Sequence, residues 1–288
     1  MKIFSLLRGP SLKPAWTFSP AGAIWRLVPS QTGELIIEAR EQDTKRATFH
    51  ALDATSGVAY WQDLMLDEPW WIGIEDVAKG TLLVHKFASP DMPQHLGIIA
   101  LELRTGKRLW SNDELTYWFS SDDSVFAHRM MFDKRVASEL DLHTGHVMKE
   151  IGEDFEFGLF QKREEAVQEN QKGLQFPEVL DFERSDPIIL RVAKKGLHSH
   201  QVQGAVEFAR FENVVIVSFH TLSGEKSEER TLLDNYLKIM DIENGGLLFS
   251  DIISHTVQSA VPDSFFVRNN MLYFIKNQKT LTAIRLSA

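Results

Sequence analysis

A short sequence motif that occurs four times limits what this chain can fold into. The first copy, ALDATSGVAYW, occupies residues 51–61, and the second, ALELRTGKRLW, occupies residues 100–110. Two more copies, ELDLHTGHVMK and IMDIENGGLLF, start at Glu139 and Ile239. Each copy has a glycine and, four residues before it, an acidic residue that follows an apolar one. The glycines are Gly57, Gly106, Gly145 and Gly245, and the acidic residues are Asp53, Glu102, Asp141 and Asp241.

The motif is typical of a β-hairpin turn. Apolar and polar residues alternate before the turn, as in IIALEL, and this two-residue period is that of a half-buried strand. Glycine tolerates the positive φ that tight hairpin turns require, and an acidic side chain can accept a backbone N–H there. Segments rich in β-branched or aromatic residues, such as ELIIEAR and VVIVSFH, precede the motifs. The sequence therefore predicts an all-β protein.

The spacing of the motifs predicts a β-propeller. Successive motif glycines, at positions 57, 106, 145 and 245, are 49, 39 and 100 residues apart. Periods in the forties with several strands per unit are typical of propeller blades. We therefore expect residues 1–288 to form a single closed propeller domain. The expected blades lie near residues 25–66, 70–113, 117–151, 204–253, and 264–288 together with 10–19.

Residues 153–203 decide between five and six blades. IILRVAKKGLHSH resembles the motif with one extra residue, and its Gly196 lies 51 residues after the third motif glycine, which favours a sixth, degenerate blade. QKREEAVQENQK is polar and helix-prone, and Pro177 and Pro187 interrupt the rest, which favours an insertion. We favour six blades, with a polar helix or long loop near residues 161–172.

The N-terminal segment is expected to complete the last blade. The C-terminal sequence TLTAIRLSA aligns with the strand before the first motif and stops before a turn glycine. Trp16, in LKPAWTFS, occupies the motif position of Trp61 and Trp110. Pairing of residues 11–19 with the strand that ends near Leu286 would cover two sheet edges, which otherwise promote aggregation.

The motif resembles the tryptophan-docking repeat of quinoprotein-like (PQQ-like) β-propellers, which have a WD40-like architecture. The pattern of that repeat is Ala-x-Asp-x-x-Thr-Gly-Lys-x-x-Trp. Residues 100–110 match it except for Glu102 in place of aspartate, and residues 51–61 keep the alanine, aspartate, glycine and tryptophan. The resemblance implies a structural role, in which Trp61 and Trp110 pack on a neighbouring blade. Over its whole length the chain resembles an uncharacterised bacterial propeller family of unknown function.

Composition excludes several classes of function. Lys and Arg number 31 against 40 Asp and Glu, so the net charge of −9 opposes binding to nucleic-acid phosphates. The absence of cysteine excludes disulfides and thiolate chemistry. No segment reaches the roughly 18 apolar residues of a membrane span, and the stretch from Lys2 to Arg8 is shorter than the roughly 7–15 apolar residues of a secretion signal. We expect a cytoplasmic monomer that binds neither nucleic acid nor membrane.

Neither a metal nor a cofactor is predicted. The pairs His143–His146 and His198–His200 are interpreted as solvent-facing residues, because a zinc site needs three or four convergent ligands. No P-loop, dinucleotide fingerprint or nucleophile elbow is present, so no catalytic residue can be named. A bound quinone is opposed by the lack of a cysteine pair, by the small number of blades and by the lack of a secretion signal.

Five aromatic residues are the candidate ligand-binding residues. They fall where the outer strand of one expected blade leads to the inner strand of the next, at Trp25, Trp70, Trp71, Tyr117 and Trp118. A ring of aromatic side chains at such crossings can form a binding site, but packing between blades is the favoured interpretation. The motif residues Trp16, Trp61 and Trp110 are assigned to packing.

Two classes of function remain open. The first is a non-enzymatic module that binds an unknown protein or small-molecule ligand. The alternative is an enzyme, a hydrolase or lyase that acts on a small polar or sugar-like substrate in the central channel. The fold alone does not decide between the two classes.

Overall fold

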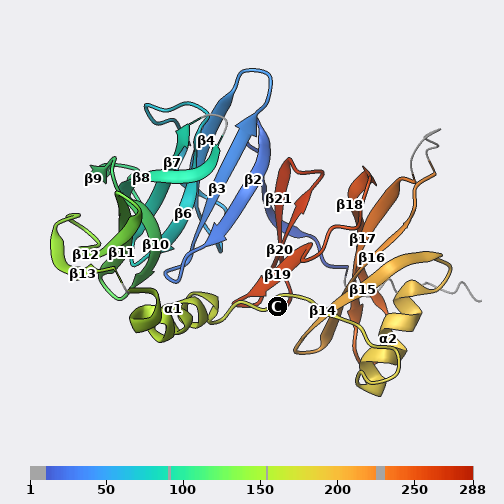
Figure 1. Cartoon of the computed structure of the whole chain (residues 1–288). Helices are drawn as coiled ribbons and strands as arrows, with labels where there is room; N and C mark the ends of the chain where they lie inside the picture. The colour runs from blue at the N-terminus through green and yellow to red at the C-terminus, as the bar shows by residue number, and fades with distance from the viewer. Residues whose placement is uncertain (1–10, 90–91, 154, 225–230, 288) are drawn as a thin grey trace, which may run out of the picture. The chain divides into compact units, whose positions relative to one another are not determined.

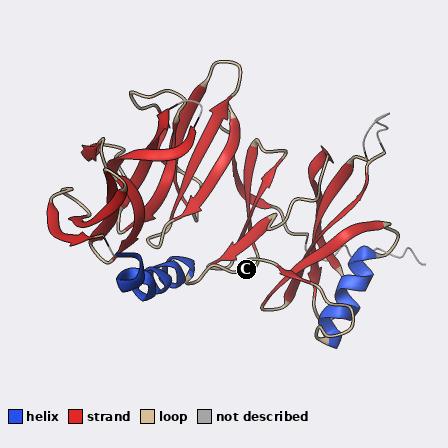
Figure 2. Ribbon diagram, viewed as in Figure 1, coloured by secondary structure: helices blue, strands red, loops and turns tan. Residues whose placement is uncertain are grey.

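The computed structural model describes residues 11–89, 92–153, 155–224 and 231–287 (Figure 1). Within these ranges the chain is mostly β-strand, with two helices, and the strands form five antiparallel sheets (Figure 2). The chain divides into two compact units. Unit 1 comprises Met1–Ser19 and Gly173–Ala288, and unit 2 comprises Pro20–Lys172. Neither described helix is long and apolar enough to cross a membrane.

Unit 2 contains three four-stranded sheets whose strands follow one another in sequence order. The first sheet consists of β2 (Ala23–Pro29), β3 (Glu34–Glu41), β4 (Arg46–Asp53) and β5 (Ala59–Leu64). The second consists of β6 (Ile72–Ala78), β7 (Thr81–Ser89), β8 (Met92–Glu102) and β9 (Arg108–Asn112). The third consists of β10 (Thr116–Ser121), β11 (Ser124–Met131), β12 (Lys134–Asp141) and β13 (Val147–Gly152), and α1 (Phe155–Gln171) follows it.

Unit 1 contains the other two sheets and the second helix. The fourth sheet consists of β14 (Glu178–Val179), β15 (Val202–Phe211), β16 (Val214–Leu222), β17 (Leu233–Asp241) and β18 (Leu247–Val257). The fifth sheet has the order β1 (Pro14–Phe18), β21 (Thr280–Arg285), β20 (Met271–Lys276) and β19 (Phe265–Arg268). The helix α2 (Pro187–Leu197) packs on the fourth sheet through Val192 and Ala193.

The four motifs form the turns between the last two strands of the first four sheets, as predicted. Each motif glycine has a positive φ, between 65° and 71°. Its N–H donates to the carbonyl oxygen of the acidic residue four positions earlier, at 2.8 to 2.9 Å. The side chains of Asp53, Asp141 and Asp241 also accept backbone N–H groups within their turns. Glu102 accepts the Thr105 hydroxyl instead, because its side chain is longer by one methylene group.

Two motif tryptophans pack against the turn of the following sheet. The indole N–H of Trp61 donates to the carbonyl oxygen of Leu103, and that of Trp110 donates to the carbonyl oxygen of Leu142, both at 2.8 Å. The indole of Trp110 lies so close to the next turn that a Cβ on Gly145 would be 2.5 Å from its Cδ2. This is the geometry that the docking repeat implies. Glycine is needed at this turn for its positive φ and also for the contact.

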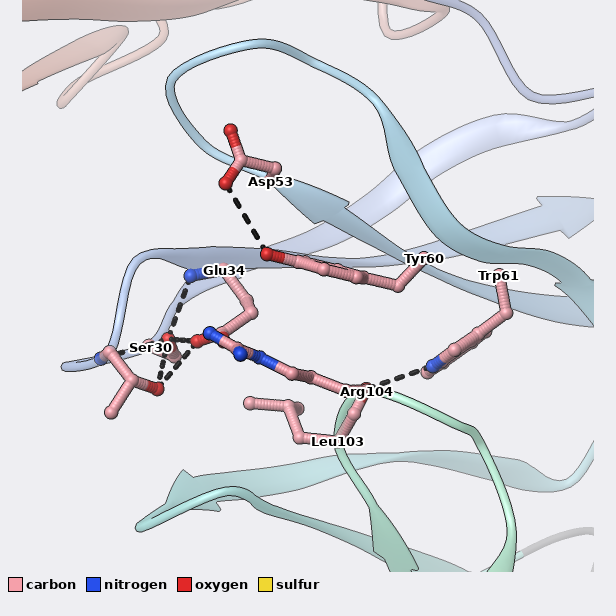
Figure 3. Close-up of polar contacts among 8 residues, drawn as sticks. Ser30, Glu34, Asp53, Tyr60, Trp61, Leu103 and Arg104 are labelled. Atoms are coloured by element: carbon pink, nitrogen blue, oxygen red, sulfur yellow. Dashed lines mark hydrogen bonds and ion pairs between the residues drawn. The ribbon is translucent and has the colours of Figure 1, made fainter.

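A buried carboxylate adds a second link between the first two sheets. Arg104, in the turn after β8, donates from Nε to Glu34 Oε1 on β3 at 2.9 Å (Figure 3). Its guanidinium lies 5.4 Å from the ring of Tyr60. Burial raises the pKa of Glu34, but hydrogen bonds from Ser30, Thr32 and Arg104 together hold that pKa below its usual value. Glu34 is therefore ionised and holds Arg104 beside the docked Trp61.

The N-terminal strand completes the fifth sheet, as the sequence predicts. β1 pairs with β21 in antiparallel register, with Trp16 opposite Ala283. The ring centroids of Trp16 and Tyr273 are 6.1 Å apart. The N–H of Leu12 donates to the carbonyl oxygen of Leu248 at 2.9 Å, so the segment also contacts the fourth sheet. Residues 1–10, which include the stretch from Lys2 to Arg8, lie outside the described residues.

The degenerate sixth blade expected in residues 153–203 is a wrong prediction. Its described residues form α1, the two-residue strand β14 and α2, and the described strands of the whole chain form five sheets. The segment IILRVAKKG is helical, because its buried residues follow a helical period: Ile189, Val192, Ala193 and Gly196. Pro187 lies in the first helical turn, where its missing N–H costs nothing, and Asp186 caps the helix. The polar helix expected near residues 161–172 is confirmed as part of α1.

Apolar side chains fill the space between successive sheets within each unit. In unit 2, Phe49 and Ile72 belong to a core shared by the first two sheets, and Leu83 and Val125 to one shared by the second and third. In unit 1, Ile239 of the fourth sheet and Leu272 of the fifth sheet belong to one shared apolar core. The expectation of one closed domain remains a prediction.

Candidate functional site

The first strand of each sheet in unit 2 carries one unpaired residue. In β2, the pairing passes from Ile24 with Ala39 directly to Arg26 with Glu38, so Trp25 is left over. The residues left over in the same way are Glu75 in β6 and Trp118 in β10. Such β-bulges turn side chains away from the regular alternation and are frequent beside functional sites. Of the three bulge residues, Glu75 is charged and the other two are tryptophans.

Glu75 lies with His85 and His95 on one face of the second sheet. Gly73 on β6 pairs with His85 on β7, and Glu75 follows two residues after Gly73. On β8 a second bulge leaves Gly97 unpaired, with a φ of 84°. This bulge brings His95 opposite Phe87, which is two residues beyond His85 and therefore on its face of the sheet. We call Glu75, His85 and His95 the histidine cluster.

The three side chains of the histidine cluster are in close contact. His95 Nδ1 lies 2.6 Å from Glu75 Oε1, and His85 Nδ1 lies 3.4 Å from the same oxygen. The two imidazoles stack with centroids 3.5 Å apart and planes 7° apart. Within the described residues, this is the only group of three or more histidine and acidic side chains whose ligand atoms lie within 4.8 Å of one another.

His85 is buried and neutral. Only 5% of its surface is exposed, and neither ring nitrogen makes a hydrogen bond within the described part of the chain. Burial, aided by the positive charges of His95, Arg26 and Arg40, lowers the pKa of His85 to about 3. The approach of Nδ1 to Glu75 is therefore not an ion pair. Burial also raises the pKa of Glu75, although the hydrogen bond with His95 opposes this shift.

Gly73 provides the space for the His85 ring. A Cβ on Gly73 would lie 2.9 Å from His85 Cε1, 3.1 Å from His85 Nε2 and 3.2 Å from Glu38 Oε2. The first contact is too close without a shift of the ring, and the other two are tighter than most contacts that a Cβ makes. Because Gly73 has no side chain, the His85 imidazole and the Glu38 carboxylate can both lie against β6.

Two charged residues of β3 hold the strand that carries Glu75. Glu38 is buried, and its Oε2 accepts the N–H of Ile74 at 3.0 Å. Arg40 donates from Nε to Glu38 Oε1 at 2.6 Å, from one terminal nitrogen to the carbonyl oxygen of Trp70 at 3.1 Å, and from the other to that of Ile72. Every guanidinium nitrogen of Arg40 is thereby used, so the Glu38–Arg40 pair is a rigid support.

Trp25, Trp70 and Trp71 lie around this support and the histidine cluster. The Arg40 guanidinium is 5.5 Å from the ring of Trp25 and 5.0 Å from that of Trp70. Trp71 packs edge-on against Phe87 at 5.9 Å, and Phe87 in turn lies 5.3 Å from the ring of His95. Trp25 is 65% exposed and Trp71 37% exposed. Three of the five aromatic residues that the sequence singles out therefore lie in one region.

Tyr117 and Trp118 make other contacts. The Tyr117 hydroxyl donates to Asp76 Oδ2 at 2.6 Å, which links the third sheet to the second. Burial and the nearby Asp76 carboxylate raise the pKa of Tyr117 well above its usual value, so it is a neutral donor. Trp118 packs edge-on against Phe155 of α1 at 4.9 Å. Both residues pack between elements of unit 2.

The histidines named from the sequence do not join the histidine cluster. His143 Nδ1 lies 3.3 Å from the hydroxyl of Thr81, in the third motif turn. His200, in unit 1, lies 3.0 Å from Lys238 Nζ. That lysine also donates to the carbonyl oxygen of Gly196, at the end of α2. These contacts indicate structural roles for His143 and His200.

Sequence reasoning missed the histidine cluster because its members are ten residues apart along the chain, on three strands. Their meeting depends on the bulges at Glu75 and Gly97, which no spacing rule reveals. Two signals were present. His85 directly follows the apolar run LLV in the strand TLLVHKF, and Glu75 lies four residues after Trp71.

A separate hollow lies at the start of α1, with a volume of about 440 Å³. Lys134 and Arg135 line it, and they pair with Glu153 at 2.6 Å and with Glu156 respectively. Because its charges are paired across its own rim, it offers a ligand fewer free groups than the histidine cluster does.

Comparisons with known proteins give no assigned activity. The model of a family described as a domain of unknown function, DUF4905, matches residues 28–110, which include Glu38, Arg40 and the whole histidine cluster. No curated protein matches the chain.

Among solved structures, 195 chains match. A structure described as the Dos1 propeller has a TM-score of 0.31 and 9% identity, over 92% of this chain and 68% of that one. Hydrazine synthase of Kuenenia stuttgartiensis has a TM-score of 0.25 and 10% identity, over 86% of this chain and 62% of that one. The chain thus spans about two thirds of the length of these structures, and likenesses this distant carry no argument about its function.

Proposed function

We propose that this protein is a non-enzymatic binding module whose ligand lies on the exposed rings around His95 in unit 2. The observation that carries the proposal is the exposure of Trp25 and Trp71, at 65% and 37%, beside a buried Glu38–Arg40 support. Large aromatic side chains at rigid, exposed positions provide binding area at a small cost in conformational entropy.

The chemistry of this region favours a small ligand with a flat or ring-shaped apolar face. Trp25, Trp71 and Phe87 offer ring surfaces, and His95, whose side chain is 36% exposed, offers a polar group. Arg40 is held in place, because each of its three side-chain nitrogens already donates one hydrogen bond, to Glu38 or to a carbonyl oxygen. Shape and stacking, with one or two hydrogen bonds, would therefore determine which ligand binds.

A panel of aromatic acids, nucleosides and monosaccharides, added separately in thermal-shift assays, tests this proposal. We expect that a compound that raises the melting temperature of the wild type has no effect on a Trp25→Ala, Trp71→Ala double variant. Leu109→Ala removes a side chain that is 42% exposed on β9 and serves as the matched control. Equal shifts in all three proteins would contradict the proposal.

The second candidate is an enzyme, a hydrolase or lyase that acts on a small polar or sugar-like substrate. The observation in its favour is the contact between Glu75 and His85, whose pKa values are shifted in opposite directions. Such pairs occur in acid–base sites, where one group must hold a proton and its neighbour must be free of one. Mass spectrometry of the bound compound distinguishes the two candidates. Recovery of unchanged ligand supports the module, and a product that disappears with Glu75→Gln supports the enzyme.

We also propose that the five sheets are the blades of one quinoprotein-like β-propeller, closed through β1. The support is the repeated docking of Trp61 and Trp110 and the pairing of β1 with β21. A compact chain of this length has a radius of gyration of about 19 Å. Small-angle scattering of the monomer should give that value, and a clearly larger one would contradict closure.

A further inference from the structure

We propose that Glu75, His85 and His95 bind one divalent transition-metal ion. The proposal shares His95 with the ring-binding ligand, but it does not need the exposed tryptophans Trp25 and Trp71. Two imidazoles and one carboxylate suit zinc, iron, cobalt or nickel better than magnesium and calcium, which prefer oxygen ligands.

The distances between the ligand atoms are close to those that a metal ion requires. Donor atoms bound to one tetrahedral zinc ion are about 3.3 Å apart. His85 Nδ1 and Glu75 Oε1 are already 3.4 Å apart. His95 Nδ1 is 2.6 Å from the same oxygen, so this contact has to open by under about 1 Å. The stacked rings must also turn, and His95 has the freedom to do so because its side chain is 36% exposed.

The second, independent observation is the state of His85. Its ring is 5% exposed, yet neither nitrogen has a hydrogen-bond partner among the described residues. Buried polar atoms without partners are uncommon, and each one calls for an explanation. A metal ion on Nδ1 supplies the missing partner.

The surroundings provide an outer carboxylate. Glu38 Oε2 and His85 Nε2 both lie within 3.2 Å of the place that a Cβ on Gly73 would take. Histidines that bind metals through one nitrogen commonly direct the other N–H toward a carboxylate. No hydrogen bond joins Glu38 to His85 among the described residues, so Glu38 becomes a positioning residue for His85 only when the ring turns on metal binding.

The charge of the region also permits a cation. The nearby carboxylates are Glu38, Glu75 and Asp76, and the nearby guanidiniums are Arg26 and Arg40. These three carboxylates and two guanidiniums leave one net negative charge when all of them are ionised. Three protein ligands leave a fourth position for water, as in other open zinc sites.

Cobalt and zinc titrations of the full-length protein, first freed of metal with a chelator, test the proposal. We expect about one equivalent of Co²⁺ to give the intense visible absorption of a four-coordinate site, and Zn²⁺ to displace it. Glu75→Gln and His85→Gln should abolish the absorption. Glu38→Gln should weaken zinc binding roughly 10- to 100-fold, as loss of an outer carboxylate does elsewhere.

Two further variants keep the result interpretable. His95→Gln changes a partly exposed side chain, so loss of binding with an unchanged apo melting temperature shows loss of a ligand and not of the fold. His143→Gln, in a motif turn outside the cluster, should bind metal like the wild type. Absence of stoichiometric binding, or equal weakening by His85→Gln, His95→Gln and His143→Gln, would overturn the proposal. The Trp25→Ala, Trp71→Ala variant should keep full metal binding, which separates this test from that of the ring-binding ligand.

Discussion

The imidazole of His85 lies directly over Gly73, so that a Cβ on Gly73 would be 2.9 Å from His85 Cε1. Gly73→Ala should therefore destabilise the protein by about 1–3 kcal/mol, the usual cost of overpacking, because neither the buried ring nor Glu38 can move freely. Gly158→Ala in α1 is the control. A Cβ there meets nothing within 4 Å, and alanine favours a helix, so urea unfolding should show no loss of stability.

The docking of Trp110 on Gly145 predicts a second difference. Trp110→Ala should cost roughly 3 kcal/mol, since it removes half-buried ring contacts and the 2.8 Å hydrogen bond to Leu142. Trp25→Ala removes an indole that is 65% exposed and should change the free energy of unfolding much less. Similar losses for the two variants in urea unfolding would refute the assignment of Trp110 to packing between sheets.

The state of His85 predicts acid lability. Its pKa is near 6.5 in the unfolded chain and about 3 in the folded protein, so below pH 6.5 the unfolded state binds a proton that the folded state does not. Stability is therefore lost as the pH falls from 6.5 toward 3, by about 2 kcal/mol at pH 5 from this residue.

Glu75 opposes this trend, because its raised pKa favours the folded state as it takes up a proton. His85→Gln isolates the contribution of the histidine, since glutamine does not titrate. Unfolding of both proteins in urea, at pH 5 and at neutral pH, should show the smaller pH dependence in the variant. The same slope in both proteins would mean that His85 protonates normally in the fold.

Removal of β1 tests the completion of the fifth sheet. A chain that lacks residues 1–19 leaves the edge of β21 unpaired and loses the contact of Trp16 with Tyr273. Aggregation or loss of cooperative unfolding is expected, because exposed edges recruit other chains. A chain that lacks only residues 1–10 retains β1 and is the matched control. Monomeric behaviour and an unchanged melting curve for the longer deletion would be incompatible with this role.

The sequence predicted those parts of the fold that depend on local repetition. The turn glycines, the docked Trp61 and Trp110, and the pairing of β1 with β21 all follow from a motif that can be aligned with itself. The error in residues 153–203 arose because IILRVAKKGL contains β-branched residues and a suitably placed glycine. Its buried positions follow a helical period, and this period correctly indicates a helix.

The candidate site was only partly predictable, because it depends on strand register. The aromatic residues Trp25, Trp70 and Trp71 were identifiable from their spacing after the motifs. The meeting of His85 with His95 was not, since one residue fewer at the Gly97 bulge would place His95 on the opposite face of β8. Strand pairings that depend on a β-bulge cannot be predicted from the sequence alone.

The most direct test of this account is the protonation state of His85 in the metal-free protein. Nitrogen-15 NMR of the histidine side chains, from about pH 7.5 to about pH 4.5, reports which ring nitrogens carry protons, and the spectrum of His85→Gln assigns the signal. The account predicts that His85 keeps the pattern of a neutral imidazole throughout, because its pKa is about 3. A signal that titrates with a midpoint near 6.5 would show that the ring is neither buried nor unpartnered, and would contradict the structure of the histidine cluster.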